Sequence, residues 1–238
     1  MAGPRLDRFL AHALSISRSD AQRLVRRGRV AIDGAPVKDP SGHVPDGARV
    51  VLDDECEVSL PGRVVVMLHK PPGVVSATRD ERDRTVLDVL PADLRVRDLA
   101  PIGRLDKDAT GLLLLTNDGE LQHRLTHPKR HVPRTYALTW SGALAPDAVA
   151  RVADGIALDD GTRCLPAELV IEGPDRGTMT VHQGMYHQVK RMVVALGGVV
   201  TSLHRTHYGP LDLGELALGA ARPLTPDERR AIGADGDA

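Results

Sequence analysis

The first sixty residues carry short hydrophobic patterns with the periods of helices and then of strands. Residues 5–14 place leucine, phenylalanine and alanine side chains at helical spacing, with arginine and histidine on the other sides. A second helix is expected within residues 17–28, which start with two good capping serines, Ser17 and Ser19, and end at a glycine. Residues 29–37 alternate apolar and polar positions around an Asp-Gly turn, which predicts a hairpin. Residues 48–54 predict another strand. The pattern predicts a small unit of two helices and a hairpin.

A longer unit begins after a Pro/Gly junction at residues 59–63. Its strands and helices do not alternate regularly, which favours an α+β domain with a mixed, mainly antiparallel sheet over a set of βαβ units. We expect domains at 1–60 and 61–232, followed by a disordered tail at 233–238. The expected strands are 64–70, 111–118, 134–140, 160–173 and 178–183, and the expected helices are 83–91 and 186–197.

Length and composition suit a soluble protein with room for two domains. The chain has 238 residues, and no apolar run approaches the roughly 18 residues of a membrane span. Its first residues lack the pattern of a secretory signal. Cys56 and Cys164 lie far apart without a metal-binding or disulfide spacing. We expect a cytoplasmic protein without redox chemistry.

The net charge of -1 conceals two basic clusters that predict contact with RNA phosphates. Within the first 29 residues, seven arginines face only two acids, and the stretch 121–136 has no acid at all. Any single arginine among them is equally typical of a solvated helix face. The predicted RNA-binding residues are Arg5, Arg8, Arg18, Arg23, Arg26, Arg27 and Arg29 in the first cluster and Arg124, Lys129, Arg130 and Arg134 in the second.

The order helix, basic helix and hairpin, with RLDRFL, SRSDAQRLVRRGRVAIDG and ARVVL, resembles the S4 RNA-binding domain. The resemblance spans roughly residues 4–60. It implies that the partner is structured RNA.

The stretch GRLDKDATGLLLLTNDG, residues 103–119, carries the most chemical information. Its RLD triplet alone is typical of a turn, but the whole stretch resembles the catalytic motif of pseudouridine synthases, in the branch that has an S4 domain and modifies ribosomal RNA. The resemblance continues through LHKPPGVVSATRDERDRTVLDVLP, HPKRHVPRTYALT, GMYHQVKRMVVALGGVV and LHRTHYGPLDLGELALGAARPLTPDE. It implies isomerisation of uridine to pseudouridine without a cofactor, with Asp106 as the nucleophile.

The same resemblance implies roles for three further residues. Lys190 is the cation that keeps Asp106 ionised, and its neighbour Arg191 lies on another helix face. Tyr136 stacks on the flipped uracil and takes a proton, and Arg104 braces the gap that the base leaves. From the residues alone, Lys190 fits a solvent-facing lysine and Tyr136 a core tyrosine equally well.

YHQVKRM resembles the motif of the enzymes that act on 16S ribosomal RNA, which implies uridine 516 as the target. Two alternatives remain open: the same chemistry on 23S ribosomal RNA, or a non-catalytic S4-type RNA-binding or ribosome assembly protein. We expect a monomer that acts on a small-subunit assembly intermediate, with no membrane partner. His123 and His127 have helical spacing, but no third ligand follows, so we expect no metal.

Overall fold

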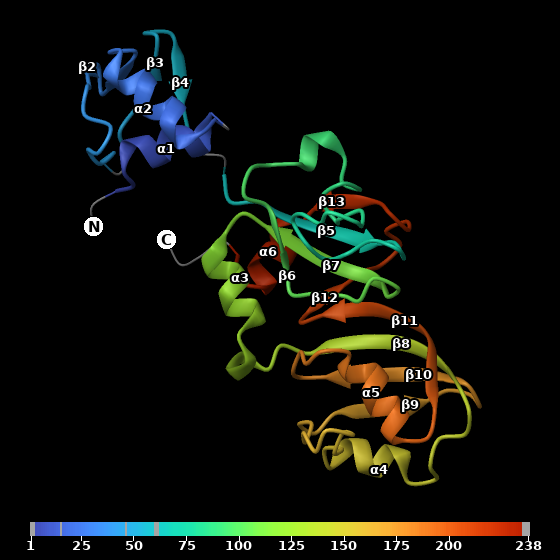
Figure 1. Cartoon of the computed structure of the whole chain (residues 1–238). Coiled ribbons are helices and arrows are strands. Elements are labelled where there is room, and N and C mark those ends of the chain that lie inside the picture. Colours follow the sequence, from blue (N-terminus) through green and yellow to red (C-terminus); the bar gives the residue numbers. More distant parts are fainter. Residues whose placement is uncertain (1–2, 15, 46, 60–61, 235–238) are drawn as a thin grey trace. The chain divides into compact units, whose positions relative to one another are not determined.

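The computed structural model describes residues 3–14, 16–45, 47–59 and 62–234, and it divides the chain into two compact units (Figure 1). The units are Met1–Arg63 and Val64–Ala238. The boundary predicted between residues 60 and 61 lies outside the described residues. Within those that are described, none of the helices is long and apolar enough to cross a membrane.

The first unit packs two helices against a small antiparallel sheet. Ser17 caps the second helix by accepting a hydrogen bond from the Asp20 N–H. Asp33 and Gly34 both have positive φ angles, as the tight turn of the predicted hairpin requires. The sheet has the order β2-β1-β3-β4. Its elements are α1 (Leu6–Ala13), α2 (Arg18–Arg26), β1 (Val30–Ile32), β2 (Ala35–Pro36), β3 (Val50–Leu52) and β4 (Cys56–Val58).

The second unit is built around a sheet of nine strands in the described part of the chain, with the main order β13-β5-β7-β11-β8-β10-β9. Most neighbouring strands are antiparallel, whereas β7 and β11 are parallel. Two short strands, β6 and β12, pair with β7 and β11. The strands are β5 (Val65–Lys70), β6 (Ala100–Ile102), β7 (Thr110–Thr116), β8 (Arg134–Ser141), β9 (Glu168–Ile171), β10 (Arg176–Val181), β11 (Val199–Tyr208), β12 (Leu211–Asp212) and β13 (Ala221–Pro223). The helices are η1 (Ala92–Leu94), α3 (Gly119–Thr126), η2 (Pro128–Arg130), α4 (Ala148–Ala153), α5 (Gln188–Ala195) and α6 (Pro226–Ala231).

Both faces of this sheet are covered, which explains why β7 has four consecutive buried leucines at its centre, residues 112–115. In β7, Leu113 and Leu115 belong to one core, and Leu112 and Leu114 belong to the core on the other face. Helices α4 and α5 contribute to the first core, and α3 contributes to the second (Figure 1). The alternation follows from the two-residue period of a strand.

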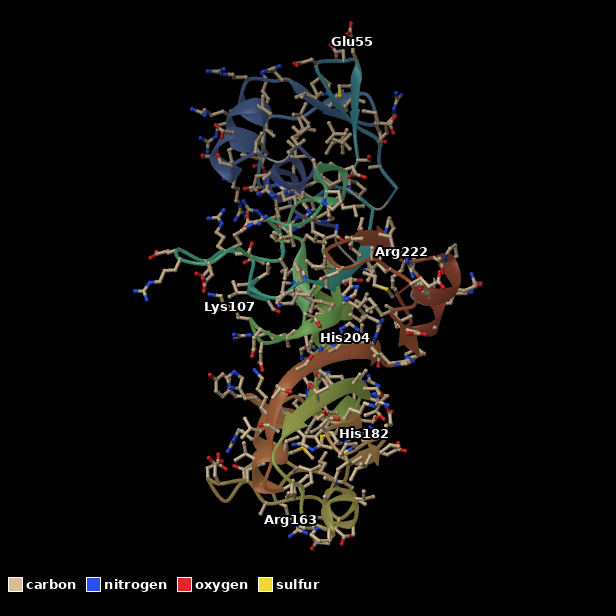
Figure 2. The ribbon with its side chains drawn as sticks, turned by 90° about the vertical axis from the view of Figure 1, so that its right-hand side faces the viewer. Glu55, Lys107, Arg163, His182, His204 and Arg222 are labelled. Atoms are coloured by element: carbon tan, nitrogen blue, oxygen red, sulfur yellow. The ribbon has the colours of Figure 1, made fainter. Side chains whose placement is uncertain are left out.

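Strand β11 joins the two halves of the sheet, between β7 and β8. Its contact with β7 depends on Gly111, which has a φ of 109° and faces Arg205 across the parallel pair. A Cβ atom at residue 111 would lie 2.2 Å from the Arg205 carbonyl oxygen, so only glycine fits. His204, on the same strand, lies near the middle of this unit (Figure 2).

Two predicted elements differ from the structure because short polar side chains bond to the backbone. The helix expected at 83–91 is a series of turns, in which the Asp88 carboxylate accepts hydrogen bonds from the Thr85 N–H and hydroxyl. The strand expected at 160–173 is reduced to Glu168–Ile171, and Asp160 accepts a bond from the Thr162 N–H before it. These local bonds favour turns over regular structure.

The beginning of the predicted tail is ordered. Gly233 and Ala234 end α6, where the Ala234 N–H bonds to the Arg229 carbonyl, and Ala234 is buried. Residues 235–238, the rest of that tail, lie outside the described residues.

Candidate active site

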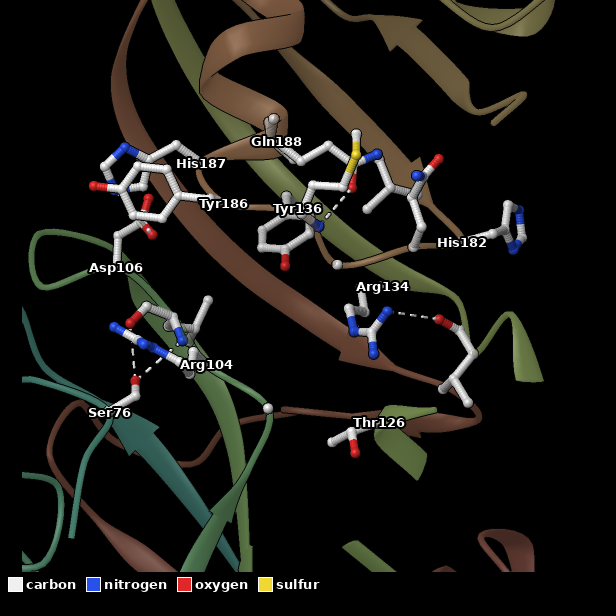
Figure 3. A pocket seen from close by; sticks show the side chains of 18 of the residues that line it. Ser76, Arg104, Asp106, Thr126, Arg134, Tyr136, His182, Tyr186, His187 and Gln188 are labelled. Atoms are coloured by element: carbon white, nitrogen blue, oxygen red, sulfur yellow. Dashed lines mark hydrogen bonds and ion pairs between the residues drawn. The ribbon is translucent and has the colours of Figure 1, made fainter. Parts of the chain in front are cut away.

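The second unit contains a pocket of about 570 Å³ that brings together three separate segments of the chain. One wall is the loop between β6 and β7, another is the start of β8, and the third runs from the end of β10 into α5. Asp106, Arg104, Tyr136 and His187 all face this space (Figure 3). Two of the residues that the resemblance implied as catalytic, Asp106 and Tyr136, therefore line one cavity, although they are distant in sequence.

Asp106 lies in the loop that leads into the buried strand β7, and its side chain remains 24% exposed. Ser76 fixes this loop from the segment after β5. Its hydroxyl donates to the Leu105 carbonyl at 2.8 Å and accepts from the Leu105 N–H at 3.0 Å. The loop is therefore held through both backbone polar groups of Leu105, the residue before Asp106.

Lys190 from α5 reaches two carboxylates of this loop. Its Nζ lies 3.1 Å from Asp106 Oδ2 and donates to both Asp108 oxygens at 2.7 and 2.9 Å. Burial alone would lower the pKa of Lys190, but the hydrogen bonds that its ammonium donates to Asp108 and Asp106 outweigh burial, so the pKa is raised. The same bond lowers the pKa of Asp108. Arg191 points elsewhere, to Asp159 and Asp160, whereas Lys190 reaches Asp106.

His187 is a neighbour of Asp106 that the sequence did not reveal. Its Nε2 lies 3.5 Å from Asp106 Oδ1, on the opposite carboxylate oxygen from Lys190. The residue occupies the N-cap of α5 with a φ of 50°, a left-handed conformation that is uncommon outside glycine. This backbone conformation starts α5 at Gln188, two residues later than expected, and turns the imidazole toward the carboxylate.

Tyr136 lies on β8 and is only 8% exposed, with its ring in the pocket wall. Arg205 from β11 lies behind it, with its Nη1 3.5 Å from the Tyr136 hydroxyl and 3.5 Å from the Arg104 carbonyl oxygen. Arg205 Nε also donates to the Leu112 carbonyl at 2.7 Å. This arginine is 1% exposed and also stacks over the Tyr208 ring at 5.2 Å. It connects the Asp106 loop, β7 and Tyr136.

Lys70 is a second buried cation below the loop. Its Nζ donates to the carbonyl oxygens of Pro71, Lys107 and Ala109 at 2.8 to 3.2 Å. Burial lowers the pKa of Lys70 to about 8, against the attraction of Asp108 and Asp106, which raises it. Lys70 thus anchors the loop on both sides of Asp108.

The basic residues of the first unit fall into two groups. Arg8, Arg26 and Arg27 are exposed, on α1 or at the end of α2. The others pair with acids on the same unit: Arg5 and Arg18 with the buried Asp7, Arg23 with Asp20, and Arg29 with Asp53.

The basic residues of the second cluster also differ from one another. Lys129 and Arg130 are exposed on η2, and Arg124 donates to the Gly233 carbonyl. Arg134 was expected on an exposed rim, but it is 9% exposed and lines the pocket wall, with its guanidinium 5.1 Å from the Tyr208 ring centroid. Arg134 is buried because it is the first residue of β8, in which alternate side chains point inward. Arg104 is exposed and borders the pocket.

The two histidines considered as metal ligands contact each other through their rings. The centroids of His123 and His127 are 5.2 Å apart, and His127 Nδ1 accepts a hydrogen bond from the Lys129 N–H. In the described part of the chain, no group of three or more histidine, cysteine or acidic side chains is arranged to hold a metal ion.

Two family models match the chain. Residues 64–161 match the model described as RNA pseudouridylate synthase, and residues 4–50 match the S4 domain. The first match contains the loop of Asp106 and the tyrosine of β8. The second contains both helices of the first unit.

Full-length relatives are also similar. The chain is 43% identical to ribosomal small subunit pseudouridine synthase A of Pseudomonas aeruginosa, over 94% of this chain and 98% of that protein. It is 38% identical to the protein of that name in Escherichia coli, over 96% of this chain and 99% of that protein. An RNA pseudouridine synthase of Bacillus subtilis is 41% identical over 94% of this chain and 96% of its own length. A solved pseudouridylate synthase superposes with a TM-score of 0.67 at 36% identity, over 96% of this chain and 99% of that one.

Proposed function

Because this chain belongs to the RNA pseudouridine synthase family, we propose that it isomerises a uridine of ribosomal RNA, with Asp106 as the nucleophile. The observation that carries the proposal is the position of Asp106. It lies at a pocket, partly exposed, with Lys190 on one carboxylate oxygen and His187 on the other. A carboxylate paired with a cation beside a cavity is suited to covalent catalysis.

The reaction moves a glycosidic bond without adding or losing atoms. In the proposed sequence, Asp106 bonds to ribose C1′ while the C1′–N1 bond breaks, and the freed base turns. Uracil C5 then bonds to C1′ as the carboxylate leaves, C5 loses its proton, and N1 gains one. No cofactor is needed, because nothing is oxidised or reduced. Splitting the rearrangement into two substitutions lowers the barrier of each.

Three side chains support this sequence in and beside the pocket. Lys190 places a positive charge 3.1 Å from the Asp106 carboxylate. Tyr136 is proposed to stack on the uracil and to take the proton that the rearrangement releases, with the Arg205 guanidinium beside its hydroxyl. Arg104, exposed at the pocket, is proposed to occupy the gap in the RNA left by the flipped nucleotide.

The proposed substrate is uridine 516 of 16S ribosomal RNA in a small-subunit assembly intermediate, met by a monomer in the cytoplasm. Full-length similarity to enzymes named for the small subunit supports this choice. The first unit, which matches the S4 domain, supplies exposed Arg8, Arg26 and Arg27 for phosphate contacts.

The proposal is tested by mapping pseudouridine in both large ribosomal RNAs from a strain that lacks this protein. We expect one modification to vanish from the 16S RNA, at uridine 516, and to return with the wild-type gene but not with Asp106→Asn. Loss from the 23S RNA instead would contradict the proposed target. Unchanged maps would favour a non-catalytic RNA-binding protein.

A further inference from the structure

The second unit presents one exposed aromatic ring beside the candidate active site. The chain has one tryptophan, three tyrosines and one phenylalanine. Four of these five residues are buried in the described structure, whereas Tyr186 is 75% exposed. A ring left in water on a chain so poor in aromatic residues calls for a binding role, since burial would stabilise it.

Tyr186 is held in place and is not a loose surface side chain. Its ring stacks on the His187 imidazole with centroids 3.9 Å apart and planes 19° from parallel. His187 is itself fixed by its left-handed backbone at the start of α5 and by its contact with Asp106. Figure 3 shows the two rings layered next to Asp106. One face of Tyr186 is therefore occupied and positioned, and its other face is open.

The surroundings favour a nucleic acid on that open face. The described residues that line the pocket include Arg104, Lys107 and Arg134, and Asp106 is the single carboxylate among them. Positive charge beside an exposed ring is how proteins bind a nucleotide chain, with cations near the phosphates and an aromatic face under a base. An acidic peptide would be attracted by the charges but would gain little from the ring.

We propose that the open face of Tyr186 stacks on the base of the nucleotide next to the flipped uridine. This inference rests on the proposed function, because it takes the target uridine to be at Asp106. The target uracil is proposed to stack on Tyr136 in the pocket wall. The Tyr186 ring, on the outer side of His187, is therefore left to contact the base of an adjacent nucleotide in the same RNA strand. Base–aromatic stacking tolerates any base, because each has a π face. The platform thus holds the RNA strand in register while the target nucleotide is turned out of its stack.

The test pairs a change in the protein with a change in the RNA. Tyr186→Ala and wild-type enzyme are assayed on 16S ribosomal RNA that carries a single abasic site on either side of the target, made by ligating a synthetic oligonucleotide. For the wild type, we expect the abasic site at one of the two positions to raise KM about tenfold, with kcat little changed. The Tyr186→Ala variant should show that increase on intact RNA and no further increase on the abasic RNA.

Matched variants separate stacking from a loss of folding. Tyr186→Phe keeps the ring and should stay within about twofold of wild type, because the stacking face is unchanged. Val199→Ala removes another exposed apolar side chain, 59% exposed and absent from the pocket lining, and should leave KM unchanged. Melting curves of all variants establish that they are folded.

The outcomes distinguish this inference from the function on which it rests. The proposed stacking is supported if an abasic site on one side of the target raises KM at least threefold more in the wild type than in Tyr186→Ala. If that difference is below threefold at both positions, and the wild-type enzyme makes pseudouridine, the stacking role of Tyr186 is wrong and the proposed function stands. A wild-type enzyme that makes no pseudouridine on intact RNA overturns both.

Discussion

Asp7 in the first unit and Asp106 in the second both lie among cations, but they differ in what else reaches them. The Asp7 side chain is fully buried and accepts hydrogen bonds from Arg5, Arg18 and Gln22 at 3.0 to 3.3 Å. Burial alone would raise the pKa of Asp7, but these bonds outweigh it and hold the pKa far below its ordinary value. Every direction from which a substrate could approach is filled by a donor.

Asp106 has fewer partners and an open side. Lys190 and His187 take one oxygen each, at 3.1 and 3.5 Å, and about a quarter of the side chain faces the pocket. The comparison shows that pairing with cations does not by itself mark a functional carboxylate. Asp7 is inaccessible, and its bonds stabilise the fold, whereas Asp106 has both neighbouring cations and an open side, as its proposed role as nucleophile requires.

The largest effect is expected from Asp106→Asn. We expect product formation to fall by more than about a thousandfold, because the amide removes the nucleophile and leaves its size unchanged. RNA affinity, measured by filter binding, should stay within a few-fold. The matched control is Asp108→Asn, which removes the other carboxylate bound by Lys190, is 74% exposed, and should remain active. If Asp108→Asn is inactive and Asp106→Asn turns over, the roles of the two aspartates are reversed.

Asp7→Asn should have the opposite pattern, with loss of stability and intact chemistry. We expect about 2 kcal/mol less stability in the first unit, because a buried carboxylate with several donors is lost. Hydrogen exchange of the α1 and α2 amides in the full chain measures this, with Asp53→Asn, an exposed partner of Arg29, as a control that should not change exchange. A pKa held low in the folded state means that this stabilisation is present near neutral pH and is lost as pH falls below about 4. Unchanged exchange would show that the Asp7 cluster contributes nothing.

Lys190→Met tests whether the neighbouring cation matters for the reaction. Without the ammonium, the carboxylate pair takes up a proton more readily, so the acid limb of the pH–rate profile should move upward by about one pH unit. Arg191→Met serves as the control, because Arg191 pairs with Asp159 and Asp160 and should leave that limb in place. A profile that moves only in the Arg191 variant would reassign the cation.

The smallest effect is expected from the exposed arginines of the first unit. Arg26→Gln combined with Arg27→Gln should reduce the magnitude of the log–log salt slope of RNA binding by about 1.4 to 1.8, at 0.7 to 0.9 per phosphate contact. KM should rise severalfold and kcat should hold, since this binding energy is remote from the reacting base. A parallel variant, Lys129→Gln with Arg130→Gln, tests the second unit. If only the parallel variant changes the slope, the electrostatic contact lies on η2 instead.

Two kinds of feature could be predicted from the sequence: elements with a local residue pattern, and residues within a long family motif. The two helices of the first unit and its Asp-Gly turn follow from period and capping. The resemblance implied Asp106, Tyr136 and Lys190 as one site, and the structure brings them to one pocket or, for Lys190, to the Asp106 carboxylate. These residues come from three elements, so spacing alone would not have joined them.

The residues that the sequence missed act through the tertiary fold. Lys70 and Arg205 lie within strands and are buried, where a charged residue would be expected to mark a surface. Their partners are mostly backbone carbonyl oxygens, which carry no side-chain signature. His187 depends on a left-handed backbone angle, which no pattern of residue types indicated.

The position of β11 has a consequence for how the enzyme is made. Thr110 and His204, which pair across β7 and β11, are 94 residues apart in the chain. During synthesis the chain therefore emerges first as two partial sheets, one carrying the Asp106 loop and the other carrying Tyr136, and only the later strand joins them. Strands that are this far apart in sequence pair slowly during folding. Asp106 and Tyr136 meet only when β11 has docked between β7 and β8, so an unfinished chain holds both residues without the pocket between them.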